Sequence, residues 1–210
     1  MPSALVFRGE RDYITYIGLM QDILPSAGVD VWAYCLMPDH VHLVAVPLTA
    51  TSLARAVGEL QRRYAIVAGP PLGRQGPLWH GRFLSCPVDH GYAILLVKYV
   101  ETDPVRAGLV DSPGDWYWSS AQPHLKKEED VLVSGKPVEA LVENWGDLLR
   151  EGLDENELDA IRRATRTGRP LGDDAFLLDL EQKLERNLRP RKRGPKPQVS
   201  WSFPIIRVPF

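Results

Sequence analysis

The chain has 210 residues, of which 44% are hydrophobic and 25% charged, which is enough for one α/β core with an appendage. No run approaches the roughly 18 apolar residues that a membrane helix needs, and no basic-then-apolar signal opens the chain, so we expect a cytoplasmic protein with no membrane partner. Cys35 and Cys86 are isolated, which excludes a paired-cysteine zinc site and a disulfide scaffold.

The net charge of -2 averages over segments of opposite sign. The chain is acidic between Glu139 and Asp159, and it carries only basic charges between Arg186 and Lys196. A pI near 6.2 therefore does not exclude a phosphate-binding surface.

The first predicted elements are a helix and a β-hairpin. Apolar residues recur at helical spacing from about Glu10, which predicts a helix that ends between Pro25 and Gly28. Residues 29–36 are typical of a strand and residues 37–39 of a tight turn. Residues 41–46 are almost entirely apolar and predict an antiparallel return strand that is buried on both faces.

Two histidines stand where this return strand begins, in the stretch Met37-Pro38-Asp39-His40-Val41-His42. Side chains alternate along a strand, so His40 and His42 leave the same face, with Cα atoms roughly 6.5 Å apart. That spacing lets two imidazoles reach one metal ion. Ordinary hydrogen bonds at a strand end are the alternative interpretation, because short motifs match by chance.

A second helix is predicted over residues 52–67, with arginines on the side opposite its apolar stripe. Residues 69–77 are rich in Pro and Gly, which indicates a loop. His80 follows and is expected to be a loop histidine outside the metal pair. Arg82 is a candidate phosphate contact.

An apolar strand is predicted over residues 83–88, followed by a helix from Asp89 to about Pro104. Tyr99 and Asp103 are four positions apart, so they share one face of that helix. They offer a nucleophile and a third metal ligand. The alternatives are a buried core aromatic and a turn-forming acid before a proline.

Helical patterns dominate beyond residue 138, with apolar stripes over 141–149 and 176–184 and a short acidic helix between them. We predict three segments: a domain over 1–125, a helical appendage over 126–188 and a basic, proline-rich tail over 189–210 that ends in apolar residues.

The tail has the charge density of a segment that tracks phosphates, although a solvated disordered end is the alternative. Its candidate DNA contacts are Arg189, Arg191, Lys192 and Arg193. The apolar end, Trp201 to Phe210, is expected to pack, and one possible place is an open sheet edge.

Several ordered blocks together resemble the REP-associated tyrosine transposases, a group of HUH single-strand nucleases. The blocks are Ala33-Tyr34-Cys35-Leu36-Met37-Pro38-Asp39-His40-Val41-His42-Leu43, Leu78-Trp79-His80-Gly81-Arg82-Phe83, Lys98-Tyr99-Val100-Glu101 with Pro104-Val105-Arg106-Ala107-Gly108-Leu109-Val110, and Trp116-Tyr117-Trp118-Ser119-Ser120. The similarity runs in order from about residue 7 to residue 121.

This resemblance implies an α+β, ferredoxin-like sandwich whose central antiparallel sheet carries the histidine strand. It implies His40, His42 and Asp103 as ligands of Mg²⁺ or Mn²⁺ and Tyr99 as the nucleophile. The implied partner is single-stranded DNA beside palindromic hairpins, bound by a monomer or a homodimer. Arg106, in the Pro-Val-Arg block, is a further candidate DNA contact.

The sequence departs from the family pattern in three ways. Asp39 and Asp103 stand where the family usually has Asn, the loop before Trp79 looks short, and the family's opening β-strand is absent. Without that strand one sheet edge would be open beside the histidine strand. Either the true start lies upstream or the copy is decaying.

The leading hypothesis is a metal-dependent single-stranded DNA endonuclease and strand transferase, a transposase, that acts through a covalent 5′-phosphotyrosine. A rolling-circle replication initiator would share the histidine pair and the later tyrosine. A catalytically decayed protein that still binds DNA hairpins is the third interpretation.

Overall fold

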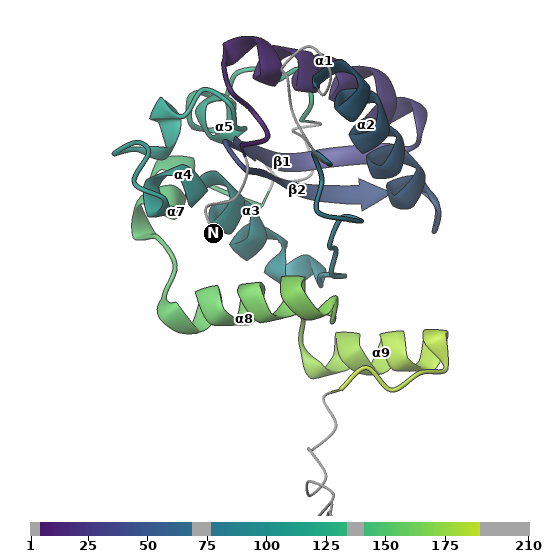
Figure 1. The fold of residues 1–210 in the computed structure, drawn as a ribbon. Coiled ribbons are helices and arrows are strands. Elements are labelled where there is room, and N and C mark those ends of the chain that lie inside the picture. Colours follow the sequence, from purple (N-terminus) through teal and green to yellow (C-terminus); the bar gives the residue numbers. More distant parts are fainter. Residues whose placement is uncertain (1–4, 69–76, 134–140, 190–210) are drawn as a thin grey trace, which may run out of the picture.

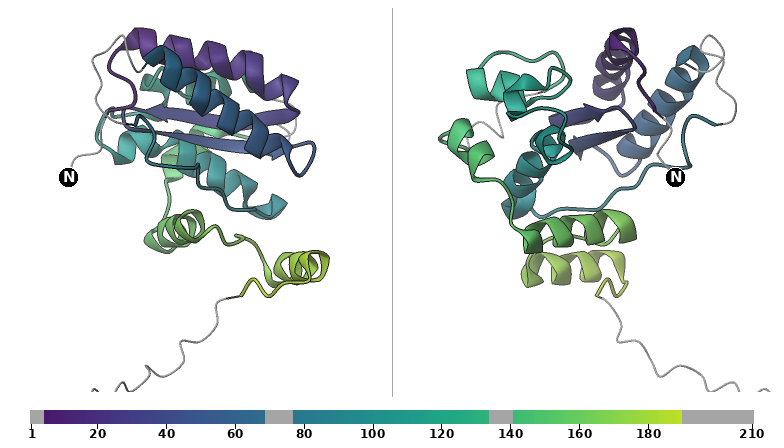
Figure 2. Two further views of the ribbon diagram at one scale, coloured as in Figure 1. Left: turned by 45° about the vertical axis from the view of Figure 1, so that its right-hand side comes forward. Right: turned by 60° about the vertical axis from the view of Figure 1, so that its left-hand side comes forward.

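The computed structural model describes residues 5–68, 77–133 and 141–189. These residues form a mixed α/β fold in which helices cover both faces of a two-stranded antiparallel sheet (Figure 1). The sheet consists of β1 (Val29–Met37) and β2 (His40–Pro47). Helices α1 (Glu10–Ser26) and α2 (Ser52–Ala68) lie on one face, and α3 (Ala93–Glu101) lies on the other, as the views in Figure 2 also show.

Helix α1 confirms the first predicted helix, since it begins at Glu10 and ends after Pro25. Its apolar stripe faces the sheet, where Tyr16 and Met20 are buried. Gly28 then reverses the chain with φ of 70°, and a Cβ there would lie 3.1 Å from the Leu48 side chain. A glycine suits this position because it adopts positive φ without steric cost.

The hairpin is confirmed, with Met37 opposite His40 and Cys35 opposite His42. The prediction that the return strand is buried on both faces is wrong, because β2 is only partly buried along its length. The buried strand is β1. Residues 118–120 run along its outer edge, where Trp118 O accepts from Leu36 N at 2.9 Å. Within the described residues β2 has a strand partner on one edge only, so its side chains meet fewer neighbours.

Helix α2 confirms the second predicted helix and packs with α1 over one core. Tyr64 is fully buried there and meets the Tyr16 ring edge to face at 4.9 Å. Val67, expected on the apolar stripe, is instead 49% exposed. Ala68, in the same last turn, is buried, so the core-facing side of that turn is occupied by Ala68 rather than by Val67.

The strand predicted over residues 83–88 is not formed, and Leu84 is 68% exposed. A strand requires a neighbouring strand that completes its ladder of hydrogen bonds. Within the described residues, this segment makes one isolated bridge instead, between Val88 and Leu171. Pro87 also lacks the N–H that a ladder needs.

The helix that carries Tyr99 is interrupted rather than continuous to Pro104. A 3₁₀ turn, His90–Tyr92, leads into α3, and the short α4 (Asp103–Arg106) follows after Thr102. Pro104 supplies no N–H for the carbonyl one turn earlier, which breaks the helical pattern. Thr102 N nevertheless donates to Lys98 O at 3.0 Å, so Tyr99 and Asp103 stay on the same side.

The C-terminal helices differ from their predicted bounds. They are α5 (Ala121–Lys126), α7 (Trp145–Glu151), α8 (Glu155–Thr167) and α9 (Asp174–Leu184), with a 3₁₀ turn, Pro113–Asp115, before them. The first predicted stripe is helical only from Trp145, where Asn144 caps the helix through Asp147 N. The acidic helix extends to Thr167. No side chain of α9 is buried, so its apolar stripe lies outside the core.

Figures 1 and 2 place α8 and α9 beyond α3, on the side away from α1 and α2. α7 packs against α3 and α5, so the appendage contacts the helix that carries Tyr99. The ferredoxin-like sandwich and the division into segments stay predictions, and Trp201 to Phe210 lie outside the described residues. None of the described helices has the length and apolar character to cross a bilayer.

Candidate active site

Three side chains from two distant parts of the chain meet at the start of β2. His40 and His42 leave the same face of the strand, and their ring centroids are 4.7 Å apart. Asp103, at the start of α4, places Oδ2 3.2 Å from His40 Nε2 and 3.5 Å from His42 Nε2. One ligand atom from each of the three lies within 4.8 Å of the others, so the group can hold a metal ion.

Asp39 orients the first histidine from the hairpin turn. His40 Nδ1 lies 2.6 Å from Asp39 Oδ1, which leaves Nε2 directed at Asp103. A carboxylate behind an imidazole commonly fixes the tautomer of a metal-binding histidine. Burial would lower the pKa of His40, but its hydrogen bonds with Asp103 and Asp39 outweigh burial and raise that pKa.

Asp103 is held as an anion. Its burial would raise the pKa of the carboxyl group, but the hydrogen bonds from His40 and His42 and the charge of Arg106 hold that pKa well below its usual range. The site therefore presents a charged oxygen between two imidazole nitrogens. This donor set suits several divalent ions.

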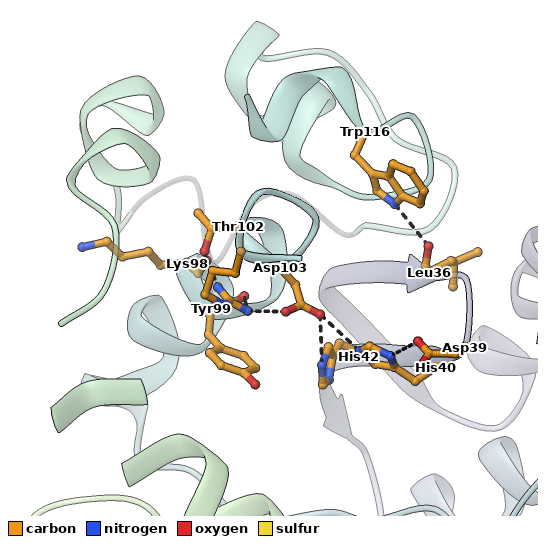
Figure 3. Close-up of polar contacts among 10 residues, drawn as sticks. Leu36, Asp39, His40, His42, Lys98, Tyr99, Thr102, Asp103 and Trp116 are labelled. Atoms are coloured by element: carbon orange, nitrogen blue, oxygen red, sulfur yellow. Dashed lines mark hydrogen bonds and ion pairs between the residues drawn. The ribbon is translucent and has the colours of Figure 1, made fainter. Parts of the chain in front are cut away.

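Tyr99 lies beside this group on α3 (Figure 3). Its ring centroid is 5.5 Å from that of His42, and the two rings meet at 72°. The tyrosine is partly buried and packs against the core cluster that contains Val97 and Val100. A substrate held near the metal group would lie within reach of this ring.

Arg106 connects the tyrosine to the carboxylate. Its guanidinium carbon lies 4.2 Å from the centre of the Tyr99 ring, and Nη2 donates to Asp103 Oδ1 at 2.6 Å. The same side chain donates to Tyr99 O at 2.7 Å and to Thr102 Oγ1 at 2.6 Å. The contacts of Arg106 in this structure are thus with its own chain, and its role as a DNA contact stays a prediction.

A buried polar network includes Glu101, two residues after Tyr99 on α3. Glu101, which is 0% exposed, accepts hydrogen bonds from Ser120 Oγ at 2.5 Å and from His124 Nδ1 at 2.6 Å. The His124 ring stacks on Trp145 of α7 at 4.2 Å. Sequence reasoning missed this network. Two features of the sequence could have indicated it: Glu101 is a charged residue in a mostly apolar helix, and a Ser-Ser pair stands directly before α5.

Among the described residues, neither Arg82 nor Arg189 belongs to the group that can hold a metal. Arg82 is exposed in the loop before α3. Arg189 is exposed and lies 3.3 Å from Asp174 Oδ1. Arg191, Lys192 and Arg193 lie outside the described residues. His80 is exposed and is not part of the group that can hold a metal.

Taken together, the fold and the site define an α/β protein with a possible histidine–carboxylate metal site beside a tyrosine. Residues 4–103, a little under half of the chain, match the family described as "Transposase IS200 like". The matched segment contains the histidine pair, Tyr99 and Asp103. No curated protein and no solved structure matches the chain.

Proposed function

We propose that the protein is a metal-dependent single-stranded DNA endonuclease and strand transferase that acts at palindromic hairpins of the REP type. The observation that carries the proposal is the meeting of His40, His42 and Asp103 beside Tyr99. The match of residues 4–103 to IS200-like transposases supports it.

The proposed cofactor is Mg²⁺ or Mn²⁺, held by the two imidazoles and the Asp103 carboxylate. The donor set fits, because a charged oxygen favours a hard divalent ion over a set of imidazoles alone. When bound there, such an ion would supply a Lewis acid next to a DNA phosphate.

Tyr99 would supply the nucleophile. Its phenol oxygen forms a bond to phosphorus as the phenolic proton is lost to solvent, and the bond from phosphorus to the 3′ oxygen breaks. The products are a 5′-phosphotyrosine and a 3′ oxygen that takes up a proton. The linkage keeps the bond energy of the original phosphodiester, so the 3′-hydroxyl of a second strand can reverse the step.

Arg106 would preorganise both reacting parts. Its guanidinium holds Asp103 at 2.6 Å and lies over the Tyr99 ring, which keeps the carboxylate and the phenol in one arrangement. We also propose Arg82 and the basic residues of the tail as phosphate contacts outside this arrangement.

A second function, hairpin binding without chemistry, is favoured by one observation. Among the described residues the free edge of β2, the strand that carries the histidines, has no strand beside it. An unsupported strand would place its ligands less rigidly. The same protein would then bind hairpin DNA and form no covalent intermediate.

The test is a labelled single-stranded hairpin oligonucleotide incubated with Mg²⁺ or Mn²⁺, followed by denaturing electrophoresis. The proposal expects a protein–DNA adduct that Tyr99→Phe abolishes and that Tyr117→Phe, at an exposed tyrosine, leaves intact. An adduct that survives Tyr99→Phe would overturn the assignment of Tyr99 as the nucleophile. Binding without any adduct would favour the second function.

A further inference from the structure

Helix α8 carries opposite charges at its two ends. Asp154 caps the helix through Glu157 N, and Glu155 and Glu157 lie in the first turn. Beyond Ile161 there is no acidic residue before Pro170. We define the α8 arginine cluster as Arg162, Arg163 and Arg166 of this half, together with Arg169, which follows the helix. All four residues are exposed.

Among the described residues, the α8 arginine cluster lacks acidic partners, as do the exposed Arg11 of α1 and Arg55 of α2, whereas Arg62, Arg63 and Arg150 have them. Arg62 and Arg63 bind Glu59 at 2.8 and 2.7 Å, and Arg150 binds Asp147 at 2.7 Å. Within the parts of the chain that the structure describes, no member of the cluster has an ion pair. Its charge is therefore available to an external anion.

Packing does not account for the cluster. The buried side chains of α8 are Leu158, Ile161 and Ala164, on the opposite side of the helix. Arg162 and Arg166 are one turn apart, and like charges at that spacing destabilise a helix. A helix C-terminus favours cations, but the effect is confined to the last turn and does not reach Arg162.

The cluster is tied to the segment that leads into the helix of Tyr99. After α8, Leu171 N donates to Pro87 O and Asp89 N donates to Leu171 O, both at 2.9 Å. Asp89 directly precedes the 3₁₀ turn that leads into α3. In Figures 1 and 2 α8 lies beyond α3, seen from the sheet. The arginines are thus anchored to the layer that carries the nucleophile, outside the metal group.

We propose that the α8 arginine cluster binds the phosphate backbone of the DNA substrate. This inference rests on the proposed function, because it takes DNA as the polyanion. Guanidinium groups form paired hydrogen bonds with phosphate, and such contacts position a nucleic acid without reading its sequence. Here they would hold the strand on the α8 side while Tyr99 meets the scissile phosphate.

The experiment compares Arg162→Gln/Arg166→Gln with Arg62→Gln/Arg63→Gln in the full chain. Each double variant removes two positive charges from an exposed helix face, so the change in net charge is matched. Binding of a fluorescent hairpin oligonucleotide with a single-stranded flank is measured across NaCl concentrations. Circular dichroism checks that both variants fold.

The α8 variant is expected to lower the slope of log K against log salt by about 1.4–1.8, since each lost phosphate contact removes about 0.7–0.9. The α2 variant should leave the slope unchanged, because Glu59 already partners its arginines. Equal changes in both variants would show a general charge effect and overturn the inference. An unchanged slope in the α8 variant would overturn it as well.

The adduct assay separates this inference from the proposed function. If the wild-type protein forms the Tyr99 adduct while the α8 slope does not change, the inference fails and the proposed function stands. If the α8 slope falls selectively while no adduct forms, the phosphate surface stands and the proposed chemistry fails.

Discussion

Arg106 joins three residues of the candidate site through one side chain. Its guanidinium lies over the Tyr99 ring and binds Asp103 and Thr102. The planar group is needed for both contacts at once, because it stacks on the ring through its face and donates through its edge.

We therefore expect Arg106→Lys to slow adduct formation while DNA affinity changes little. Lysine keeps the charge but cannot stack and donate together, and the loss of a charge-assisted hydrogen bond costs about 1.5–3 kcal/mol, or roughly 10-fold to 150-fold in rate. Single-turnover adduct rates and oligonucleotide affinity are measured on the same protein.

The matched comparison is Arg82→Lys, at an exposed arginine that we propose as a phosphate contact. It should leave the adduct rate at saturating DNA unchanged. Arg106→Lys could instead weaken DNA binding and keep the wild-type adduct rate at saturating DNA. Arg106 would then be a DNA contact and not a residue that positions Tyr99 and Asp103.

At the level of the elements, the buried carboxylate of Glu101 joins α3 to the segment before α5 and to α5 itself. Ser120 and His124 supply its two hydrogen bonds, and Trp145 of α7 covers His124. The buried Lys98 of α3 also forms an ion pair with Glu151 of α7 at 2.8 Å. Polar contacts as well as apolar packing therefore fix α3, the helix that carries Tyr99, against α5 and α7.

We expect His124→Ala to lower the free energy of unfolding by about 1–3 kcal/mol, because it removes one of the two hydrogen-bond partners of the fully buried Glu101 side chain. Urea denaturation measures the change. His80→Ala, at an exposed histidine, is the control and should change stability by about 0.5 kcal/mol or less. Equal effects of the two substitutions would show that the network is not needed for stability.

At the level of the whole molecule, the proposed metal would join two layers of the fold. His40 and His42 belong to strand β2 of the sheet. Asp103 begins α4, which follows α3, the helix that covers the other face of the sheet from α1 and α2. An ion held by all three would therefore stabilise the contact between the sheet and the α3 layer. Anything that binds the folded state alone raises the apparent stability.

Mn²⁺ or Mg²⁺ is thus expected to raise the thermal unfolding midpoint of the wild-type protein. At about 100 times the dissociation constant the gain is about 2.7 kcal/mol, or roughly 5–10 °C for a chain of this size. Asp103→Ala should lose the metal-dependent shift, and Asp103→Asn, which keeps a neutral oxygen, should show an intermediate one.

Asp111→Ala, at an exposed aspartate, is the control for this shift and should behave as the wild type. Each protein is compared with itself without metal, so a lower baseline stability of a variant does not affect the result. A full shift in Asp103→Ala would remove Asp103 from the ligand set.

The sequence by itself determined the features that depend on local periodicity. The 3.6-residue spacing of Tyr13, Tyr16 and Met20 predicted α1, and the two-residue spacing of His40 and His42 placed both imidazoles on one face of β2. Both were confirmed, because neighbouring side chains in one element are arranged by backbone geometry alone. The four-residue spacing of Tyr99 and Asp103 also predicted their shared side correctly, although Thr102 interrupts the helix.

Only the tertiary structure decided the features that require a distant partner. Residues 83–88 have the composition of a strand but no ladder beside them, and β2 is less buried than its apolar residues indicated. The distance between Asp103 and the histidines and the hydrogen bond between Glu101 and His124 join separate parts of the chain. No sequence period encodes such contacts, because they arise when independently formed elements pack together.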